Sequence, residues 1–357
     1  MKKAILTAVL FVAAAIAASV PVQCRSLTFN SNGEFKIMQL TDLHLKGNYP
    51  SECSRVYDRI SYMVEQEHPD FIVITGDLVY SKPARPVISE LTSHLDSFGI
   101  PWAVVFGNHD AEQDLSRQEL SALYASGRNS MNTLGSNGEL ADLEIPLVSG
   151  SGTDALYCLY LLDSHDYSTI EGLDGYGWFN TAQIQWMRSC CSARKMPDGK
   201  PVPALAFFHI PLREYIDAWA PMENPRPEQK NKKTCAGMRG ENIAAGALNT
   251  GMFAAMKEFG NIVGVFAGHD HDNDFVANYQ GIALCYGRFS GCDGVYNNIP
   301  CGAKFILVKA GERKFETWTR DDHGRVSVHV TTDGNTLKKA PSRPKGGLNG
   351  QWTDVPE

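Results

Sequence analysis

The sequence predicts a layered α/β fold in which amphipathic helices separate strands of a mixed sheet. Eight short apolar runs, rich in β-branched or aromatic residues, recur along the chain. Their continuous apolar character indicates strands that are buried on both faces. Helical patterns lie between several of these runs, so the chain begins with the order strand–helix–strand–helix–strand and continues with more strands. This order is typical of layered α/β architecture.

The predicted elements follow one another without an internal repeat or a linker that would divide the chain. The expected strands are FKIMQL (35–40), FIVIT (71–75), WAVVF (102–106), ALYCLYLLD (155–163), PALAFFHI (203–210), IVGVFAG (262–268), GIALCYG (281–287) and AKFILVKA (303–310). The expected helices span 55–67, 86–99, 181–195 and 250–260. The second helix ends at a glycine and the third begins at a threonine cap, which are common helix boundaries. A length of 357 residues allows one large domain or two smaller ones. Because no linker divides the chain, we expect one domain, 25–331.

The first 23 residues have the composition of a secretory signal peptide. A short basic start precedes an unbroken apolar stretch and then small residues around Ala17–Ser19. An uncleaved membrane anchor is the alternative, because Ala4–Val22 is nearly long enough to span a bilayer. The alanine-rich composition and the small-residue end favour cleavage. We therefore expect a secreted or periplasmic protein without stable membrane insertion after cleavage.

Two polar segments are expected to lie outside the regular elements. Residues 221–242 are polar, basic and proline-containing, and predict a long loop between strands. Residues 332–357 are polar with two prolines and a Gly-Gly pair, and predict a loosely packed tail.

Charge and cysteine content limit the classes of function and of site. The formal net charge of −7 argues against a generic nucleic-acid binder, which normally presents a basic face. A small phosphorylated substrate remains compatible, because bound metal ions supply local positive charge. None of the nine cysteines has CxxC spacing, so they are interpreted as structural. In an exported chain, a disulfide is most expected among Cys285, Cys292 and Cys301.

Polar side chains follow five of the apolar runs, at the point where each predicted strand ends. These segments are Thr41-Asp42-Leu43-His44, Gly76-Asp77, Gly107-Asn108-His109-Asp110, His209 and Gly268-His269-Asp270-His271. In open α/β sheets, binding residues gather beyond the carboxyl ends of the strands. The three glycines suit sharp turns where the backbone approaches a ligand closely. The five segments together therefore predict one site, although a lone histidine is usually a core or surface residue.

The residue types at these strand ends predict a metal site. The candidate ligands are Asp42, His44, Asp77, Asn108, His209, His269 and His271. The set mixes carboxylate, amide oxygen and imidazole without thiolate, which suits Mn, Fe or Zn better than a structural tetrahedral zinc. Seven ligands exceed the needs of one ion, so we expect two ions that share a carboxylate. Asp77 is the expected bridge, since each of its oxygens can bind an ion.

The motifs DLH, GD, GNHD, a strand-end H and GHDH, in this order, resemble those of the calcineurin-like metallophosphoesterases. The resemblance covers roughly residues 33–310. The stretches FFHIPLREY (207–215), GHDHDNDF (268–275), YGWFN (176–180) and YGRFSG (286–291) are similar to the purple acid phosphatase 29-like branch. The resemblance implies a two-sheet β-sandwich flanked by helices, with a dinuclear site at one edge. It assigns one ion to Asp42, His44, Asp77 and His271, and the other to Asp77, Asn108, His209 and His269.

One departure from the purple acid phosphatases concerns a tyrosine. Those enzymes use a tyrosine three residues after the bridging aspartate and have glycine where His44 stands. Tyr80 has this spacing from Asp77, yet His44 is also present. We therefore expect His44 to replace the tyrosinate ligand, and Tyr80 is not assigned to the metal.

The resemblance also implies hydrolysis of phosphoesters, most simply phosphomonoesters, by a hydroxide shared between the two ions. His109 is the candidate general acid, and Asp42 or Asp110 is the carboxylate expected to orient its ring. A hydrogen bond that only supports the site is the alternative role for His109. Arg288 is a candidate for binding the substrate phosphate, with a surface ion pair as the alternative. His165 is interpreted as a core or surface residue.

Two other functions stay open at this point. A phosphodiesterase or nucleotide hydrolase would use the same metals, because the sequence does not expose the shape of the substrate pocket. A non-catalytic scaffold with the same fold would be expected to lose ligands, and none of the seven is missing. The expected partner is a small phosphorylated substrate, with no nucleic-acid binding beyond nucleotides that act as substrates.

Overall fold

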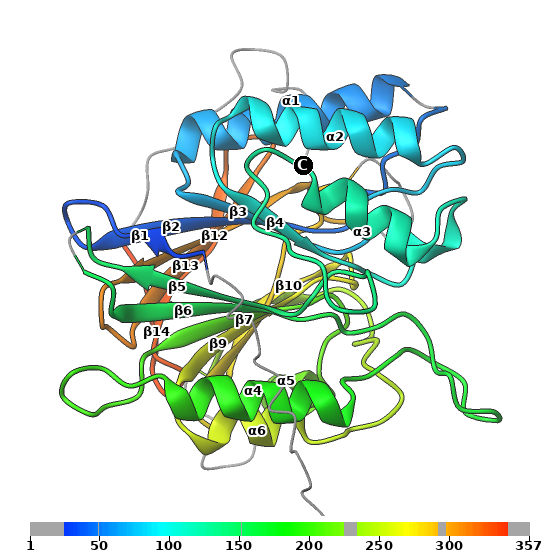
Figure 1. Ribbon diagram of the computed structural model, residues 1–357. Coiled ribbons are helices and arrows are strands. Elements are labelled where there is room, and N and C mark those ends of the chain that lie inside the picture. The colour runs from blue at the N-terminus through cyan, green and yellow to red at the C-terminus, as the bar shows by residue number, and fades with distance from the viewer. Residues whose placement is uncertain (1–24, 49, 151, 225–233, 292–297, 342–357) are drawn as a thin grey trace, which may run out of the picture.

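The computed structural model of the protein describes residues 25–48, 50–150, 152–224, 234–291 and 298–341. Within them, two β-sheets lie face to face, and helices cover the outer face of each sheet (Figure 1). This is the two-sheet sandwich flanked by helices that the sequence and its resemblance predicted.

A seven-stranded sheet forms one half of the sandwich, in the order β15-β14-β13-β12-β2-β3-β4. Its strands are β2 (Glu34–Leu40), β3 (Phe71–Thr75), β4 (Trp102–Val105), β12 (Gly302–Lys309), β13 (Phe315–Asp321), β14 (Val326–Thr332) and β15 (Leu337–Lys339). Strands β2, β3 and β4 run parallel to one another, whereas β12 to β15 pair antiparallel. The carboxyl ends of the three parallel strands therefore meet at one edge.

An eight-stranded sheet forms the other half, in the order β1-β5-β6-β7-β9-β11-β10-β8. Its strands are β1 (Leu27–Thr28), β5 (Leu143–Val148), β6 (Ala155–Leu161), β7 (Ala204–Phe207), β8 (Cys235–Arg239), β9 (Ile262–Ala267), β10 (Asn273–Tyr279) and β11 (Ile282–Tyr286). Strands β6, β7, β9 and β11 are parallel neighbours.

Six α-helices form the outer layers among the described residues. They are α1 (Pro50–Glu67), α2 (Arg85–Ser97), α3 (Arg117–Ala125), α4 (Thr181–Ala193), α5 (Glu214–Glu223) and α6 (Met252–Glu258). The first three cover the seven-stranded sheet and the last three cover the eight-stranded sheet (Figure 1). The cap of α4 is Asn180 rather than the expected threonine, because its side chain accepts the Gln183 backbone N–H.

The apolar strand sequences follow from this layering. In β3, Phe71 and Val73 face the opposite sheet. Ile72 and Ile74, on the other face of the strand, pack beneath the helices. Successive side chains of a strand point to opposite faces, so a strand covered on both sides must be apolar throughout. Burial of each such side chain contributes about 1.5–3 kcal/mol.

Two expectations about polar segments are wrong. Residues 337–339 of the expected tail form β15, which pairs with β14 and buries Leu337. The expected loop at 221–242 contains the end of α5 and all of β8, an edge strand that pairs with β10. Both strands lie at sheet edges with several exposed side chains, so their sequences lack the apolar runs that identify interior strands.

Several expectations concern residues whose structure is not described. The signal-peptide segment 1–23, Cys292 and the end of the expected tail, 342–357, all lie outside the described residues. Cys285 is a free and fully buried thiol, so the expected disulfide does not involve it. In the part of the chain that is described, no helix has both the length and the apolar character to cross a membrane.

Candidate metal centre

The seven predicted ligands converge at one edge of the sandwich, where parallel strands of both sheets end. Asp42 and His44 follow β2, Asp77 follows β3, Asn108 follows β4, His209 follows β7, and His269 and His271 follow β9. The ligand atoms form two groups there, and within each group they all lie within 4.8 Å of one another. One group is Asp42, His44 and His271, and the other is Asp77, His209 and His269. The carboxyl ends of parallel strands thus build the site, as in other open α/β sheets.

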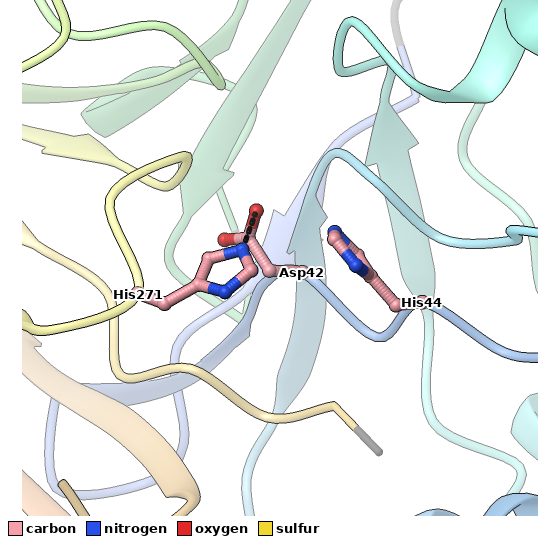
Figure 2. Close-up of side chains that lie close together, drawn as sticks. All are labelled: Asp42, His44 and His271. Atoms are coloured by element: carbon pink, nitrogen blue, oxygen red, sulfur yellow. Dashed lines mark ion pairs between the residues drawn. The ribbon is translucent and has the colours of Figure 1, made fainter. Parts of the chain in front are cut away.

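The first group gathers around the Asp42 carboxylate. Its Oδ1 lies 3.5 Å from His271 Nε2, and the rings of His44 and His271 meet edge to face with centroids 4.9 Å apart (Figure 2). Asp42 Oδ1 is buried and has no hydrogen-bond partner among the described residues. A buried carboxylate oxygen that accepts no hydrogen bond and faces an imidazole nitrogen at 3.5 Å fits a cation, because a buried polar atom without a hydrogen bond is otherwise costly.

The second group gathers around the buried His209 ring. Its Nε2 lies 3.2 Å from Asn108 Oδ1, 3.2 Å from His269 Nδ1 and 3.3 Å from Asp77 Oδ2. Its Nδ1 lies 2.7 Å from the Thr75 carbonyl oxygen. That acceptor favours a proton on Nδ1, which leaves the Nε2 lone pair for a metal ion.

Asp77 lies between the two groups. Its Oδ2 is 3.4 Å from His44 Nε2 in the first group and 3.3 Å from His209 Nε2 in the second. Its Oδ1 accepts the His109 backbone N–H at 2.9 Å, which holds the carboxylate in place. This is the position that a carboxylate shared by two ions requires.

Burial and the charges of neighbouring ligands shift the pKa values of the ligand side chains. Burial alone would raise the pKa of the Asp42 carboxyl, but the ion pair with His271 and the charge on His209 lower it to about 2. Burial likewise opposes the charge of His209, yet Asp77 raises its pKa to about 10, so an ion bound at Nε2 would displace a proton from that nitrogen. Burial and the neighbouring His209 lower the pKa of His269 to about 3, so His269 is held as the neutral imidazole that binds metal.

The backbone at the strand ends is strained in a way that marks functional sites. Four of the seven candidate ligands have a positive φ, which is uncommon for residues other than glycine: Asp42 (54°), His44 (46°), Asp77 (52°) and His269 (77°). Such left-handed conformations cost free energy and persist only where the surrounding structure imposes them. The glycines beside them are required sterically. A Cβ at Gly76 would overlap the His209 ring, and one at Gly268 would overlap the Thr41 hydroxyl.

A cavity of about 410 Å³ opens over the two groups. It is lined by His44, Lys46, Asp77, Tyr80, His109, Tyr176, Glu241, Ala244, His269, Asp270 and His271. The Tyr80 ring stacks beside His44 with centroids 6.1 Å apart and is 43% exposed. That Tyr80 is not a metal ligand stays an expectation from the sequence.

His109 lies on the cavity wall, but the carboxylate beside its ring is not one of the expected pair. Its Nδ1 lies 2.7 Å from Glu112 Oε2, across the 3-10 turn Asp110–Glu112. Asp110 instead accepts backbone N–H groups, at 2.9 Å from Asp77 and 2.8 Å from Gly107. The expectation that Asp42 or Asp110 orients His109 is therefore wrong. The i,i+3 spacing of His109 and Glu112 is the sequence signal that could have revealed the pair, had the turn been predicted.

Arg288 does not reach the cavity as a phosphate-binding group. Its guanidinium forms a buried ion pair with Asp274, through Nε at 3.1 Å and Nη2, and its Nη1 donates to the Pro300 carbonyl at 2.9 Å. The phosphate-binding role is thus a wrong expectation, and the ion pair is buried rather than at the surface. His165 Nε2 lies 2.9 Å from the Gln183 side-chain oxygen, outside both ligand groups.

Comparison with known proteins places the chain among phosphoesterases. Residues 35–273 match the family model described as calcineurin-like phosphoesterase. The chain is 29% identical to the "probable inactive purple acid phosphatase 29" of Arabidopsis thaliana, over 86% of this chain and 87% of the relative. It is 31% identical to the yeast (Saccharomyces cerevisiae) "phosphatase DCR2", over 71% of this chain and 48% of the relative. Its fold is similar to that of a dimetal phosphatase from Danio rerio, with a TM-score of 0.55 at 15% identity, covering 80% of this chain and 96% of that one.

Proposed function

Because the chain belongs to the calcineurin-like phosphoesterase family, we propose that it is a metal-dependent phosphohydrolase that cleaves phosphoesters, most simply phosphomonoesters. The observation that carries the proposal is the pair of ligand groups at the cavity, with the Asp77 carboxylate between them. The Arabidopsis relative is named "probable inactive", so hydrolysis by this chain must be measured directly.

The donors present fit two divalent or trivalent ions such as Mn, Fe or Zn. One ion would be held by Asp42, His44, Asp77 and His271, and the other by Asp77, Asn108, His209 and His269. When bound, two such ions supply an activated water nucleophile and offset the charge on the phosphate oxygens. The chain's own contribution is to hold these side chains rigidly, with Thr75 and the strained strand ends as supports.

His109 is proposed to protonate the leaving oxygen of the substrate. Glu112 Oε2 accepts a hydrogen bond from His109 Nδ1 at 2.7 Å, which leaves Nε2 as the nitrogen that can pass a proton to the substrate. The ring lies on the cavity wall with its side chain 34% exposed, so a leaving group can approach it.

The substrate is proposed to be a small phosphorylated compound. A cavity of about 410 Å³ lies within the size range of small-molecule pockets. The protein is proposed to act outside the cytoplasm, secreted or periplasmic, because its first 23 residues have the composition of a signal peptide.

Elemental analysis of the purified protein, coupled to a phosphoester panel with and without added Mn, tests the proposal. About two ions per chain and hydrolysis of p-nitrophenyl phosphate are expected. Preferential hydrolysis of bis(p-nitrophenyl) phosphate would instead favour a phosphodiesterase. Fewer than about one ion per chain, with no hydrolysis of any ester, would favour a non-catalytic scaffold.

A further inference from the structure

We propose that Tyr167 is a positioning residue that couples the metal ligand Asn108 to the acid His109 through a single hydroxyl group. The inference rests on the proposed function. It assigns a role to a residue on a loop outside the five strand-end segments. Tyr167 lies between β6 and α4, on a hairpin-like loop whose Tyr167 and Tyr176 form an isolated antiparallel bridge.

The Tyr167 hydroxyl lies between two groups of the site. It donates to Glu112 Oε1 at 2.7 Å and accepts from Asn108 Nδ2 at 3.0 Å. The other oxygen of the same carboxylate, Glu112 Oε2, lies 2.7 Å from His109 Nδ1. A hydroxyl has one donor and can accept as well, so a single group satisfies both contacts. The result is a continuous network from the Asn108 amide to the His109 imidazole.

For Asn108, the hydroxyl determines which side of the amide faces the metal group. The Nδ2 donors point at Tyr167, so the carbonyl oxygen Oδ1 faces His209 at 3.2 Å. Only the oxygen of an amide can bind a cation, because the amide nitrogen has no available lone pair. Removal of the hydroxyl therefore removes the contact that distinguishes the two orientations of the amide.

For His109, the hydroxyl acts through Glu112. The side chains of both residues are about one-third exposed, at 34% and 36%, so they can adopt other rotamers. A second bond to Tyr167 restrains the carboxylate and, through it, the imidazole ring. Groups that orient a ligand or an acid in this way commonly change affinity or activity by roughly 10- to 100-fold.

The loop itself is anchored at its base and packed against the site at its other end. The Arg117 side chain forms ion pairs with both Asp163 and Asp166 at the start of the loop. The rings of Tyr167 and Tyr176 stack with centroids 5.8 Å apart. Tyr176 in turn meets the His269 ring edge to face at 4.2 Å. The Tyr167 hydroxyl is therefore presented from a fixed scaffold rather than from a free loop.

The substitution Tyr167→Phe removes only the hydroxyl and retains the stacked ring. Tyr160→Phe is the matched control, because its hydroxyl also donates to a carboxylate, Glu144 Oε1 at 3.2 Å, and neither residue belongs to the ligand groups. We expect Tyr167→Phe to weaken Mn binding, measured by calorimetry, by about 10-fold. We also expect kcat for an alkyl phosphate such as glycerol phosphate to fall roughly 10- to 100-fold, with little change in KM.

A purely structural role would give a different pattern. It would lower the melting temperature of Tyr167→Phe while leaving Mn affinity and the ratio of kcat for alkyl and p-nitrophenyl phosphates unchanged, and that result would overturn the proposal. Non-additive losses in the double variant with Glu112→Gln would support one shared network, whereas simple additivity would contradict it.

Calorimetry also separates failure of this inference from failure of the proposed function. A wild-type protein that binds no Mn overturns both. A wild-type protein that binds Mn but cleaves no phosphoester overturns the proposed function, while weaker Mn binding by Tyr167→Phe would still support the contact with Asn108. Unchanged Mn affinity and unchanged kcat in Tyr167→Phe overturn the role of Tyr167 alone.

Discussion

The Asp110 carboxylate accepts the backbone N–H of Asp77 at 2.9 Å, although the two residues lie 33 positions apart in the chain. The same carboxylate accepts the N–H groups of Leu78 and Gly107, both at 2.8 Å. One buried side chain thus holds together the ends of β3 and β4, the two strands that present Asp77 and Asn108. Asp110 contributes to the site by shaping its backbone.

Asp110→Ala should therefore destabilise the fold. Four backbone donors, the three named above and the Val79 N–H at 3.4 Å, would lose their acceptor. Each buried unsatisfied group costs about 1–3 kcal/mol, so we expect a loss of at least about 4 kcal/mol in the free energy of unfolding. Urea denaturation measures this loss, with the exposed Asp154→Ala as the control. A fully stable Asp110→Ala variant with reduced kcat would show that Asp110 acts on the chemistry instead.

His109→Ala should separate metal binding from proton transfer. The ring is not one of the ligand groups, so the metal content measured by elemental analysis should stay at the wild-type level. Turnover of alkyl phosphates should fall by roughly 10²- to 10⁴-fold, because their leaving oxygen needs a proton. The loss on p-nitrophenyl phosphate, whose leaving group is already a weak base, should be much smaller. Equal losses on both substrates would argue against a general acid.

Arg288→Met should change stability rather than substrate binding. Its guanidinium pairs with the buried Asp274, which Lys304 also contacts. Loss of one partner from a buried ion pair costs about 3–5 kcal/mol, and the remaining Lys304 should keep the effect near the lower end of that range. Thermal or urea unfolding measures it. A raised KM for phosphoesters with unchanged stability would restore Arg288 as a phosphate-binding residue.

Asp274 predicts a loss of stability in acid. Burial would raise the pKa of its carboxyl, but Arg288 and Lys304 lower it from 3.8 to about 2. Because the folded-state pKa lies below that of the unfolded chain, the stabilisation is complete above about pH 4 and is lost as the pH falls towards 2. The effect is on the order of 2 kcal/mol.

Unfolding curves between pH 5 and 2 test this dependence. Asp274→Asn should be less stable than the wild type at pH 7, because it leaves two buried cations without a counter-charge. Its stability should fall less steeply with acid than that of the wild type. Parallel pH profiles for the two proteins would show that another carboxyl causes the acid loss.

The interior strands and the ligands could be predicted because their signals are local. A strand covered on both faces must be apolar along its whole length, as FIVIT is in β3. A ligand at the carboxyl end of such a strand follows it directly in sequence, as Asp77 follows β3 with one glycine between them. The edge strands β8 and β15 lack this signal, since solvent accepts polar side chains on their exposed faces.

The sequence by itself determined the class of fold and the seven candidate ligands, because strand burial and strand-end chemistry are written in short continuous segments. Only the tertiary structure decided which carboxylate forms a hydrogen bond or an ion pair with which group. Glu112 accepts from the His109 ring, and Asp274 pairs with Arg288. Asp110 accepts backbone N–H groups, such as that of Gly107. These pairings depend on side-chain direction and on contacts between segments far apart in the chain, and a hydrogen bond or an ion pair is set by distances of a few tenths of an ångström that no residue order encodes.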